Sequence, residues 1–361
     1  MKRFLWLLII LSFAAAASPS RSNAQSEAPE NIIFLIGDGM GAGQLTVMKT
    51  VLGGIALDAF PVAGFSMTQS LNDFATESAA GGTALSTGER TNNYMISQRP
   101  DGTALPTLLE AARVRGKGVG VVVTSSLTHA TPASFLSHVP NRKMEFDIAL
   151  QIAGSGADVL IGGGRRFFLP QEKGGDRKDG RNVIAEMQAD GYVYADTIDA
   201  ALPARGRLLW LLADEGLPSA SKRAYSLKDL VKAAIALLSQ NGNGFVLVVE
   251  GSQIDWAAHD NDFAELKAEL RDFDGAISAA LSFAEKNAKT LLVVTADHET
   301  GGLAVIGNKP DGSDMQGKWI WGEHTGNMVP VFAMGPGSYI FGGIHRNNEI
   351  GRMLHDLLKL R

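Results

Sequence analysis

The residues of this sequence best suited to chemistry are carboxylates and imidazoles at short spacings. Asp255 and His259 stand four apart in Glu250-Gly-Ser-Gln-Ile-Asp-Trp-Ala-Ala-His. On a helix this spacing places both side chains on one face, about 6 Å apart along the axis. A carboxylate and an imidazole in that arrangement can bind one zinc ion, although an exposed polar helix face has the same spacing. The motif therefore predicts either part of a zinc site or a solvated helix face.

Further candidate ligands follow apolar runs or lie in loops. Asp297 and His298 end such a run, and in the turn after a strand both can converge on one ion. Asp38 has a glycine on each side, which lets the backbone approach a ligand closely, although Gly-Asp-Gly also forms ordinary turns. His324 lies in Gly-Glu-His-Thr-Gly, where a lone histidine is usually a surface residue. Together, three aspartates and three histidines suit two zinc ions with nitrogen and oxygen ligands.

A nucleophile and a group that could bind an anion are also present. The segment Thr76–Gly88 predicts a helix of small residues that begins near Ser78 and is stopped by Gly88. A serine at a helix N-terminus is usually a cap. Here, small residues would let a ligand approach, and the helix dipole would stabilise an alkoxide or a phosphoseryl group. Arg142, expected to open a helix after His138-Val-Pro-Asn, can hold two phosphate oxygens with its guanidinium or lie on the surface.

The elements that must position these residues are strands buried on both faces. Continuous apolar, β-branched runs are typical of such strands, and they are Asn31–Gly37, Val119–Thr124, Asp158–Gly162, Phe245–Val249, Leu291–Thr295 and Val329–Met334. Helical patterns lie between them, at Leu105–Arg115, Ser226–Ser239, Phe263–Glu285 and Glu349–Lys359. This alternation predicts an α/β fold with a doubly wound, mostly parallel central sheet and helices on both faces.

In such a sheet, ligands bind beyond the carboxyl ends of the strands. The candidate residues follow this rule, because the predicted strands are followed by Asp38, by Thr128-His129-Ala130-Thr131, by Glu250 and by Asp297-His298. His324 stands just before the last strand. We therefore expect nearly all potential metal ligands at one edge of the sheet.

The composition fits one large domain. The chain has 361 residues, of which 45% are hydrophobic and 20% are charged, and no repeat or linker divides it. Residues 1–24 have the pattern of a secretory signal, with Lys2 and Arg3 at the start, an apolar run at Phe4–Phe13 too short to span a bilayer, and a cleavage site after Ala24. A retained N-terminal anchor is the alternative. Residues 25–361 then form the mature domain, which we expect to be exported to a periplasm or the medium.

The charge and the absence of cysteine exclude several classes of protein. Removing residues 1–24 takes away Lys2, Arg3 and Arg21 and no acid, so the formal charge of −5 becomes −8. An acidic chain without a basic run is not expected to bind nucleic acid. No further stretch of about 18 apolar residues predicts a membrane span. Because the sequence has no cysteine, stability must come from the core and from metals rather than from disulfides.

The ordered set of motifs resembles the alkaline phosphatase family, and the resemblance covers nearly all of the mature chain. The matching stretches are Ile33–Gly41, Glu77–Gly88, His129–Arg142, Val159–Pro170, Val249–His259, Val294–Gly302 and His324–Pro330. The resemblance implies metal-dependent hydrolysis of small phosphate monoesters at alkaline pH, through a phosphoserine intermediate at Ser78. It also implies a homodimer.

Carried over residue by residue, the resemblance implies two Zn²⁺ ions and one Mg²⁺ ion. Asp255, His259 and His324 would hold the first zinc. Asp38, Asp297 and His298 would hold the second zinc, with Ser78 bound to it. Asp38, Thr131 and Glu250 would hold the magnesium ion, and Arg142 would bind the phosphoryl group.

The sequence departs from the family pattern near the phosphate. Glu77 stands where the family commonly has an aspartate that orients the arginine, so the pose of Arg142 is left open. His129 and Trp256 replace the aspartate and lysine of some members, and His129 is expected either as a direct ligand of the third metal or as a contact outside its ligands. The segment from Lys309 to Trp321 is short, so a large insertion found in some members is missing.

Two other functions are compatible with parts of this pattern. One is a phosphodiesterase of the same superfamily, but those enzymes often use a threonine nucleophile and lack an arginine at this site, unlike Ser78 and Arg142. The other is a non-catalytic exported protein that binds metal or phosphate, which the intact nucleophile argues against. No loop composition indicates whether the substrate carries a sugar, a nucleotide or a lipid headgroup.

Overall fold

A computed structural model describes residues 28–195, 197 and 206–359 of the chain. The predicted signal peptide, residues 1–24, lies outside the described residues. Within the described part, no helix combines the length and the apolar character needed to cross a membrane.

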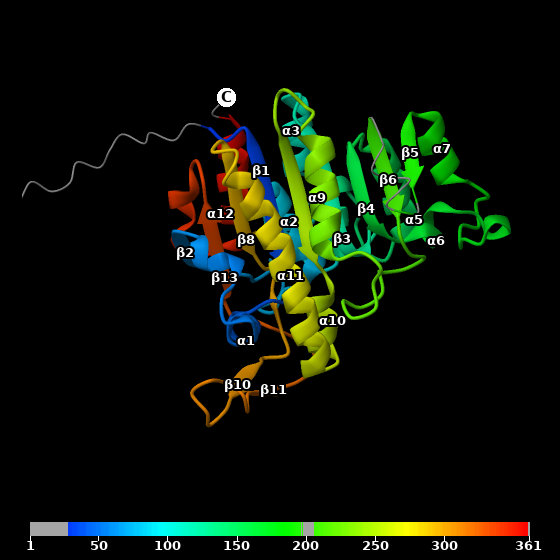
Figure 1. The fold of residues 1–361 in the computed structure, drawn as a ribbon. Helices are drawn as coiled ribbons and strands as arrows, with labels where there is room; N and C mark the ends of the chain where they lie inside the picture. Colours follow the sequence, from blue (N-terminus) through cyan, green and yellow to red (C-terminus); the bar gives the residue numbers. More distant parts are fainter. Residues whose placement is uncertain (1–27, 196, 198–205, 360–361) are drawn as a thin grey trace, which may run out of the picture.

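A ten-stranded sheet runs through the centre of the described part (Figure 1), in the order β14-β2-β13-β8-β1-β7-β3-β4-β6-β5. Its strands are β1 (Asn31–Gly37), β2 (Val62–Met67), β3 (Gly118–Ser126), β4 (Val159–Gly163), β5 (Tyr192–Ala195), β6 (Arg207–Leu211), β7 (Phe245–Gly251), β8 (Thr290–Thr295), β13 (Val329–Met334) and β14 (Gly343–Arg346). Four shorter strands form two separate pairs, β9 (Glu299–Thr300) with β12 (His324–Thr325) and β10 (Ala304–Ile306) with β11 (Gln316–Lys318).

Strand directions confirm the prediction of a mostly parallel sheet. β13 is antiparallel to both of its neighbours, β8 and β2. The other neighbouring strands of this sheet pair in parallel, as β1 does with β7 and β8. Because β13 runs the opposite way, its first residue lies at the edge where the parallel strands end. This direction is why His324, which precedes β13, lies beside residues that follow the other strands.

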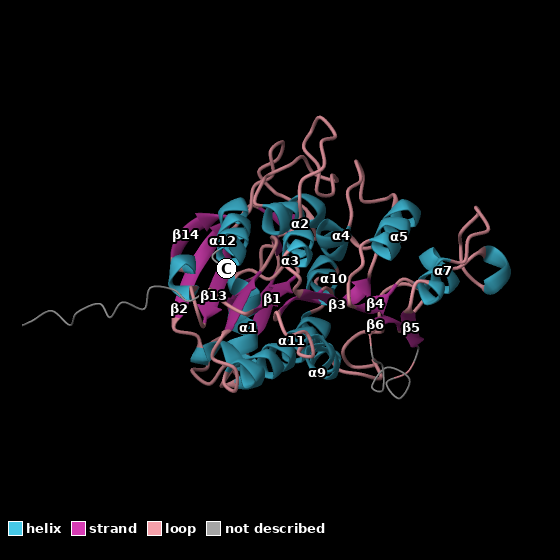
Figure 2. Ribbon diagram, turned by 90° about the horizontal axis from the view of Figure 1, so that it is seen from above, coloured by secondary structure: helices cyan, strands magenta, loops and turns pink. Residues whose placement is uncertain are grey.

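Helices cover both faces of the sheet (Figure 2): α1, α9 and α11 lie on one side, and α2, α3, α4, α5 and α12 lie on the other. The helices are α1 (Ala42–Leu52), α2 (Ser78–Thr87), α3 (Leu108–Val114), α4 (Ala130–Leu136), α5 (Glu145–Gly154), α6 (Arg165–Phe168), α7 (Val183–Ala189), α9 (Leu227–Leu238), α10 (Gln253–His259), α11 (Phe263–Ala284) and α12 (Asn347–Lys359). Short 3₁₀ turns occupy Ala56–Ala59, Gln171–Lys173 and Ser338–Phe341. Each helical layer packs on the sheet through its own apolar cluster.

The strands that sequence patterns miss lie toward the sides of the sheet. β2 and β14 are half-exposed or exposed, so neither is a continuous apolar run. The short run of β6 (Arg207–Leu211) is apolar but fits a helix equally well. The predicted helix start at Leu105 is three residues early, because the Thr107 side chain caps the helix and Leu108 is its first residue. Arg142 lies in the turn before α5, so the expectation that it opens a helix is wrong.

Candidate active site

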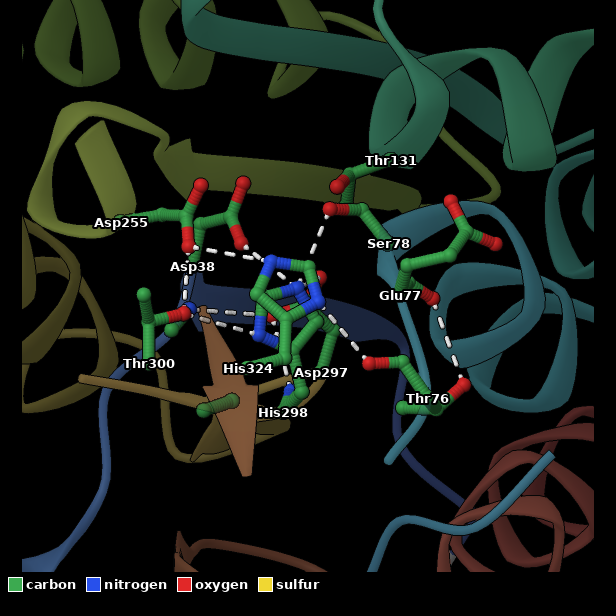
Figure 3. Close-up of polar contacts among 12 residues, drawn as sticks. Asp38, Thr76, Glu77, Ser78, Thr131, Asp255, Asp297, His298, Thr300 and His324 are labelled. Atoms are coloured by element: carbon green, nitrogen blue, oxygen red, sulfur yellow. Dashed lines mark hydrogen bonds and ion pairs between the residues drawn. The ribbon is translucent and has the colours of Figure 1, made fainter. Parts of the chain in front are cut away.

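Ser78 is the first residue of α2, yet it does not cap this helix. The cap is Glu77, whose carboxylate accepts hydrogen bonds from the backbone N–H groups of Ala79 at 3.0 Å and Ala80 at 2.9 Å. The Ser78 hydroxyl is therefore free to face the site, where its Oγ lies 3.2 Å from His298 Nε2 (Figure 3). The helix ends at Gly88, which has a left-handed backbone with φ of 75°, so the predicted start and end of this helix are confirmed.

Two glycines are required by the crowding among the residues of the site. A Cβ at Gly81 would lie 2.9 Å from the carbonyl oxygen of Asp297, so the small residue lets α2 pack directly against the turn that carries a candidate ligand. Gly39 has φ of +67°, and a Cβ there would lie 2.7 Å from Thr300 Oγ1 and 2.9 Å from Asp255 Oδ1. The turn after β1 therefore needs glycine for both its conformation and its contacts.

The first cluster of candidate ligands consists of Asp255, His259 and His324. Asp255 and His259 lie on α10 as predicted, with His259 Nε2 at 3.3 Å from Asp255 Oδ2. The Nε2 atoms of His259 and His324 are 3.1 Å apart. The Nδ1 atoms of these two rings donate to backbone carbonyls, to Gly322 at 2.6 Å and to Thr76 at 3.0 Å. Both Nε2 atoms therefore face the cluster, which is the orientation of metal-binding imidazoles.

The second cluster consists of Asp38, Asp297 and His298, all fully buried. His298 Nε2 lies 3.3 Å from Asp38 Oδ1 and 3.3 Å from Asp297 Oδ2. Thr300 joins the two clusters (Figure 3), because its hydroxyl donates to Asp255 Oδ1 at 2.5 Å and accepts from His298 Nδ1 at 3.3 Å. This bond leaves His298 Nε2 unprotonated toward the cluster. Sequence reasoning missed Thr300, whose only signal is its place directly after Asp297-His298-Glu299.

The third cluster consists of Asp38, His129 and Glu250. Glu250 Oε2 accepts from Ser252 at 2.5 Å and from Ser125 at 3.3 Å, while Glu250 Oε1 has no hydrogen-bond partner among the described residues. The nearby hydroxyl of Thr131, fully buried at the start of α4, also lacks a partner within the described structure.

Arg142 is held at the edge of these clusters by two contacts. Its Nη1 donates to Glu77 Oε2 at 2.5 Å, and its Nη2 donates to His129 Nε2 at 3.0 Å. Glu77, one methylene longer than the aspartate common in the family, therefore contacts the arginine and helps to set the pose of Arg142. The ring of Trp256 packs edge-on against His129, with 6.1 Å between ring centroids.

Among the described residues, the buried carboxylates of the second and third clusters have no lysine or arginine paired with them that would stabilise their negative charge. Burial and the nearby charges of Asp297, Asp255 and Glu250 raise the pKa of Asp38 well above its usual range. Burial raises the pKa of Glu250 to about 7 and that of Asp297 to about 6. Both oxygens of Asp38 and the Oδ2 of Asp297 have no hydrogen-bond partner in the part of the chain that is described. Crowded carboxylates without hydrogen-bond partners, beside imidazole nitrogens that face them, form a donor set that suits divalent cations.

A cavity of about 620 Å³ opens above these clusters. Its lining brings together eight of the predicted site residues, which are Glu77, Ser78, His129, Arg142, Asp255, Trp256, His259 and His324. The other five, Asp38, Thr131, Glu250, Asp297 and His298, are completely buried. The cavity is also lined by Asp73, Asn93, Tyr94, Trp321 and Glu323, which sequence reasoning did not select because they belong to loops without a recognisable motif.

Comparisons with known proteins agree with this geometry. The alkaline phosphatase family matches residues 29–318. Alkaline phosphatase 3 of Bacillus subtilis is 33% identical to the chain, covering 99% of it and 97% of that protein. The solved structure of alkaline phosphatase from the Antarctic bacterium TAB5 superposes with a TM-score of 0.87 at 36% identity, covering 93% of this chain and 99% of that one.

Two further solved structures are of TAB5 variants in which one histidine is replaced by aspartate or by glutamate, each with magnesium bound in the M3 site. They superpose with TM-scores of 0.86 and 0.85, also at 36% identity, and each covers 93% of this chain and 99% of the TAB5 chain. On the family match and the extent of these similarities, the chain belongs to the alkaline phosphatase family and is a metal-dependent hydrolase of phosphate monoesters.

Proposed function

We propose that Ser78 is the nucleophile and that hydrolysis proceeds through a phosphoserine at this residue. The observation that carries the proposal is the position of Ser78 Oγ, which lies 3.2 Å from His298 Nε2 at the N-terminus of α2 while Glu77 performs the capping. A hydroxyl that the helix does not use, beside a set of metal-binding donors, is suited to attack phosphorus. The partial positive charge of the helix N-terminus favours both the alkoxide and the phosphorylated serine.

The metal ions implied by the family fit the donors present. We propose zinc in the first and second clusters, where imidazole nitrogens and carboxylates are combined, and magnesium near Asp38, Thr131 and Glu250, where oxygens dominate. When bound, these ions would supply positive charge beside the serine hydroxyl and the phosphate oxygens, which lowers the pKa of the hydroxyl. The magnesium recorded in the M3 site of the TAB5 variants supports a third metal position here, with His129 as our candidate for the replaced histidine.

Arg142 would bind the phosphoryl group. Its guanidinium lies in the same cavity as Ser78, and Glu77 and His129 each contact one of its terminal nitrogens. A guanidinium held in one orientation can donate to two phosphate oxygens at once. Charge that develops on those oxygens as the phosphoryl group is transferred would then be met by a preorganised donor.

This arrangement favours monoesters over diesters. A monoester presents more charged oxygens than a diester, and Arg142 lies where such an oxygen would need a partner. The Ser78 hydroxyl, which does not cap α2, argues against a protein that only binds phosphate. Binding alone requires no hydroxyl beside the metal donors. Small phosphate monoesters are therefore the proposed substrates.

The test is hydrolysis of p-nitrophenyl phosphate by purified protein above pH 8. We expect activity to be abolished by exhaustive chelation and to return when zinc and magnesium are added together. Bis-p-nitrophenyl phosphate, assayed beside it, should be the poorer substrate. Full activity after chelation, or a preference for the diester, would contradict the proposal.

We also propose that the protein is exported as residues 25–361, a single catalytic domain, after cleavage behind Ala24. The support is the charged and apolar pattern of residues 1–24. N-terminal sequencing of protein recovered outside the cytoplasm would test this. A mature protein that begins at Met1 would contradict it.

A further inference from the structure

The outer part of the catalytic cavity has a chemistry of its own. Besides the residues proposed to bind phosphate and metals, the cavity is lined by two aromatic residues, Tyr94 and Trp321, and by two acidic residues, Asp73 and Glu323. Tyr94 and Trp321 are 51% and 52% exposed, and Asp73 and Glu323 are exposed as well. These exposed residues are in the same cavity as Ser78 and Arg142, so they are available to contact the alcohol part of a phosphate ester.

Tyr94 is fixed beside the residues proposed to bind phosphate. Its backbone N–H donates to Glu77 Oε1 at 2.8 Å, and its carbonyl accepts from the backbone N–H of Arg142 at 2.8 Å. Its φ is +73°, a conformation that non-glycine residues rarely adopt and that persists only where the surroundings impose it. The backbone is therefore held in an unfavourable conformation that places an exposed aromatic ring at the mouth of the cavity.

Whereas Tyr94 lies beside Glu77 and Arg142, Trp321 and Glu323 belong to a loop beside His259. They flank Gly322, whose carbonyl accepts the Nδ1–H of His259 at 2.6 Å, and the Glu323 carbonyl accepts from the backbone N–H of Gly301 at 2.9 Å. Ser78 lies instead against His298. In an in-line displacement the leaving group departs on the side opposite the nucleophile, so the loop that carries Trp321 and Glu323 is placed to meet it.

The charge of this outer region is negative and uncompensated. Among the described residues that line the cavity, Arg142 is the one lysine or arginine, and it is paired with Glu77. Neither Asp73 nor Glu323 forms an ion pair with another residue of the described structure. The carboxylates of the three clusters and a bound phosphate dianion would offset the charge of the proposed metal ions, which leaves Asp73 and Glu323 to set the sign of the field at the mouth.

Aromatic faces together with carboxylates are the groups that bind ammonium ions. We propose that the outer cavity, formed by Asp73, Tyr94, Trp321 and Glu323, binds a cationic leaving group, so that preferred substrates are phosphate monoesters of amino or quaternary ammonium alcohols. This inference rests on the proposed function of Ser78 and the metal clusters. Leaving groups that carry further phosphates would be repelled by the same carboxylates.

The test compares two esters of nearly the same shape with the metal-loaded enzyme. Phosphocholine carries a quaternary nitrogen, and 3,3-dimethylbutyl phosphate carries a neutral carbon in its place. We expect kcat/KM for phosphocholine to exceed that for the neutral ester by about 5- to 30-fold at low salt, the range that cation–π and charge contacts correspond to. The difference should shrink as salt is added, because the carboxylates are exposed.

Variants separate this preference from any intrinsic difference between the two esters. Trp321→Leu and Glu323→Gln should each lower the ratio of the two kcat/KM values by about 3- to 10-fold. Tyr94→Phe keeps the ring and should keep the ratio, whereas Tyr94→Leu should lower it. Glu172→Gln makes the same charge change at an exposed residue outside the cavity lining and should leave the ratio at the parent value.

An unchanged ratio in both Trp321→Leu and Glu323→Gln would overturn the proposal, as would a parent enzyme that hydrolyses the two esters equally well. Either result leaves the proposed function intact, because both esters are still hydrolysed. If neither ester nor p-nitrophenyl phosphate is hydrolysed by metal-loaded protein, the proposed function fails first and the proposed cationic preference falls with it.

Discussion

Glu77 Oε2 accepts a hydrogen bond from Arg142 Nη1 at 2.5 Å, while the same carboxylate caps α2. One side chain thus ties the helix that carries Ser78 to the arginine proposed to bind phosphate. Arg142 itself lies in a turn before α5 rather than on a helix. Single and double variants of Glu77 and Arg142 can measure how each residue contributes to the hydrolysis of phosphate esters.

Arg142→Ala should lower kcat/KM for p-nitrophenyl phosphate by about 10- to 100-fold, since a charge-assisted hydrogen bond contributes about 1.5–3 kcal/mol. The loss should be smaller for a diester. Glu77→Gln should reduce monoester turnover less in Arg142→Ala than in the parent, because part of its effect passes through the arginine and part through the cap of α2. Arg165→Ala, at an arginine paired with Asp214 outside the cavity lining, is the control. Equal losses on both substrates would show that Arg142 does not touch the phosphoryl group.

Ser78→Ala should reduce turnover by several orders of magnitude, because the covalent route is lost while the positioning of the substrate remains. The free energy of unfolding should change by less than about 1 kcal/mol, since Glu77 and not Ser78 caps the helix. Ser86→Ala makes the same change at a buried serine of α2 outside the cavity lining and should keep activity. Near-parent turnover in Ser78→Ala would remove the residue from the chemistry.

Much of this site could be predicted because its ligands follow strands or stand four apart on a helix. The pairing of Asp255 with His259 and the convergence of Asp297 with His298 both follow from local geometry. Placing His324 required the antiparallel direction of β13, which no local pattern gives. The contacts of Thr300, Tyr94 and Glu77 depend on backbone turns fixed by tertiary packing, so their roles emerge only from the folded chain.

Zinc binding should release protons. In the metal-free protein, the hydrogen bond to Asp255 raises the pKa of His259 to about 9, so the ring is protonated at pH 7. A metal-bound imidazole must be neutral. The apparent zinc affinity should therefore rise with pH and level off above about pH 9. Titration of chelated protein with zinc in a weakly buffered solution would measure the release, which should fall in His259→Gln. No release at pH 7 would contradict the assignment of His259 as a ligand.

A buried ion network outside the lining of the catalytic cavity should contribute to stability. Arg223 bonds Glu269 at 2.6 Å and Asp272 at 2.8 Å, and these side chains are almost completely buried. Arg223→Met would leave two buried carboxylates unpaired, a loss of about 3–5 kcal/mol. Burial already raises the pKa of Glu269 to about 6. The penalty should therefore be largest at pH 8 and smaller at pH 5, where a carboxyl with a raised pKa is protonated at lower cost.

Urea unfolding of Arg223→Met beside the parent at each pH would measure this loss, since effects common to both proteins cancel. Arg181→Met is the matched control, because Arg181 forms an exposed pair with Glu186 and surface pairs contribute little. Adding Glu269→Gln to Arg223→Met should restore part of the loss by removing one buried charge. Equal stability of Arg223→Met and the parent at both pH values would show that the network does not stabilise the fold.

The last prediction concerns the protonation of His129. A guanidinium has only donors, so the bond from Arg142 Nη2 to His129 Nε2 at 3.0 Å requires Nε2 to accept. Burial and the charge of Arg142 lower the pKa of His129 to about 3, so the ring is neutral and carries its proton on Nδ1. That buried Nδ1 has no partner in the described structure. An N–H at Nδ1 can neither coordinate magnesium nor accept a hydrogen bond from a water that the ion holds, so the parent should bind magnesium weakly.

His129→Asp would replace this donor with a carboxylate, which orders magnesium-bound waters or binds the ion directly. We expect the magnesium concentration that half-activates zinc-loaded enzyme to fall by about 10-fold or more. His129→Asn offers an oxygen of similar reach without the charge. It should lower the half-activating magnesium concentration by less than His129→Asp does. Trp256→Lys, which adds a cation beside the same ring, should instead strengthen inhibition by phosphate. If the parent shows no response to magnesium and His129→Asp gains none, neither His129 nor Trp256 lies near a third metal.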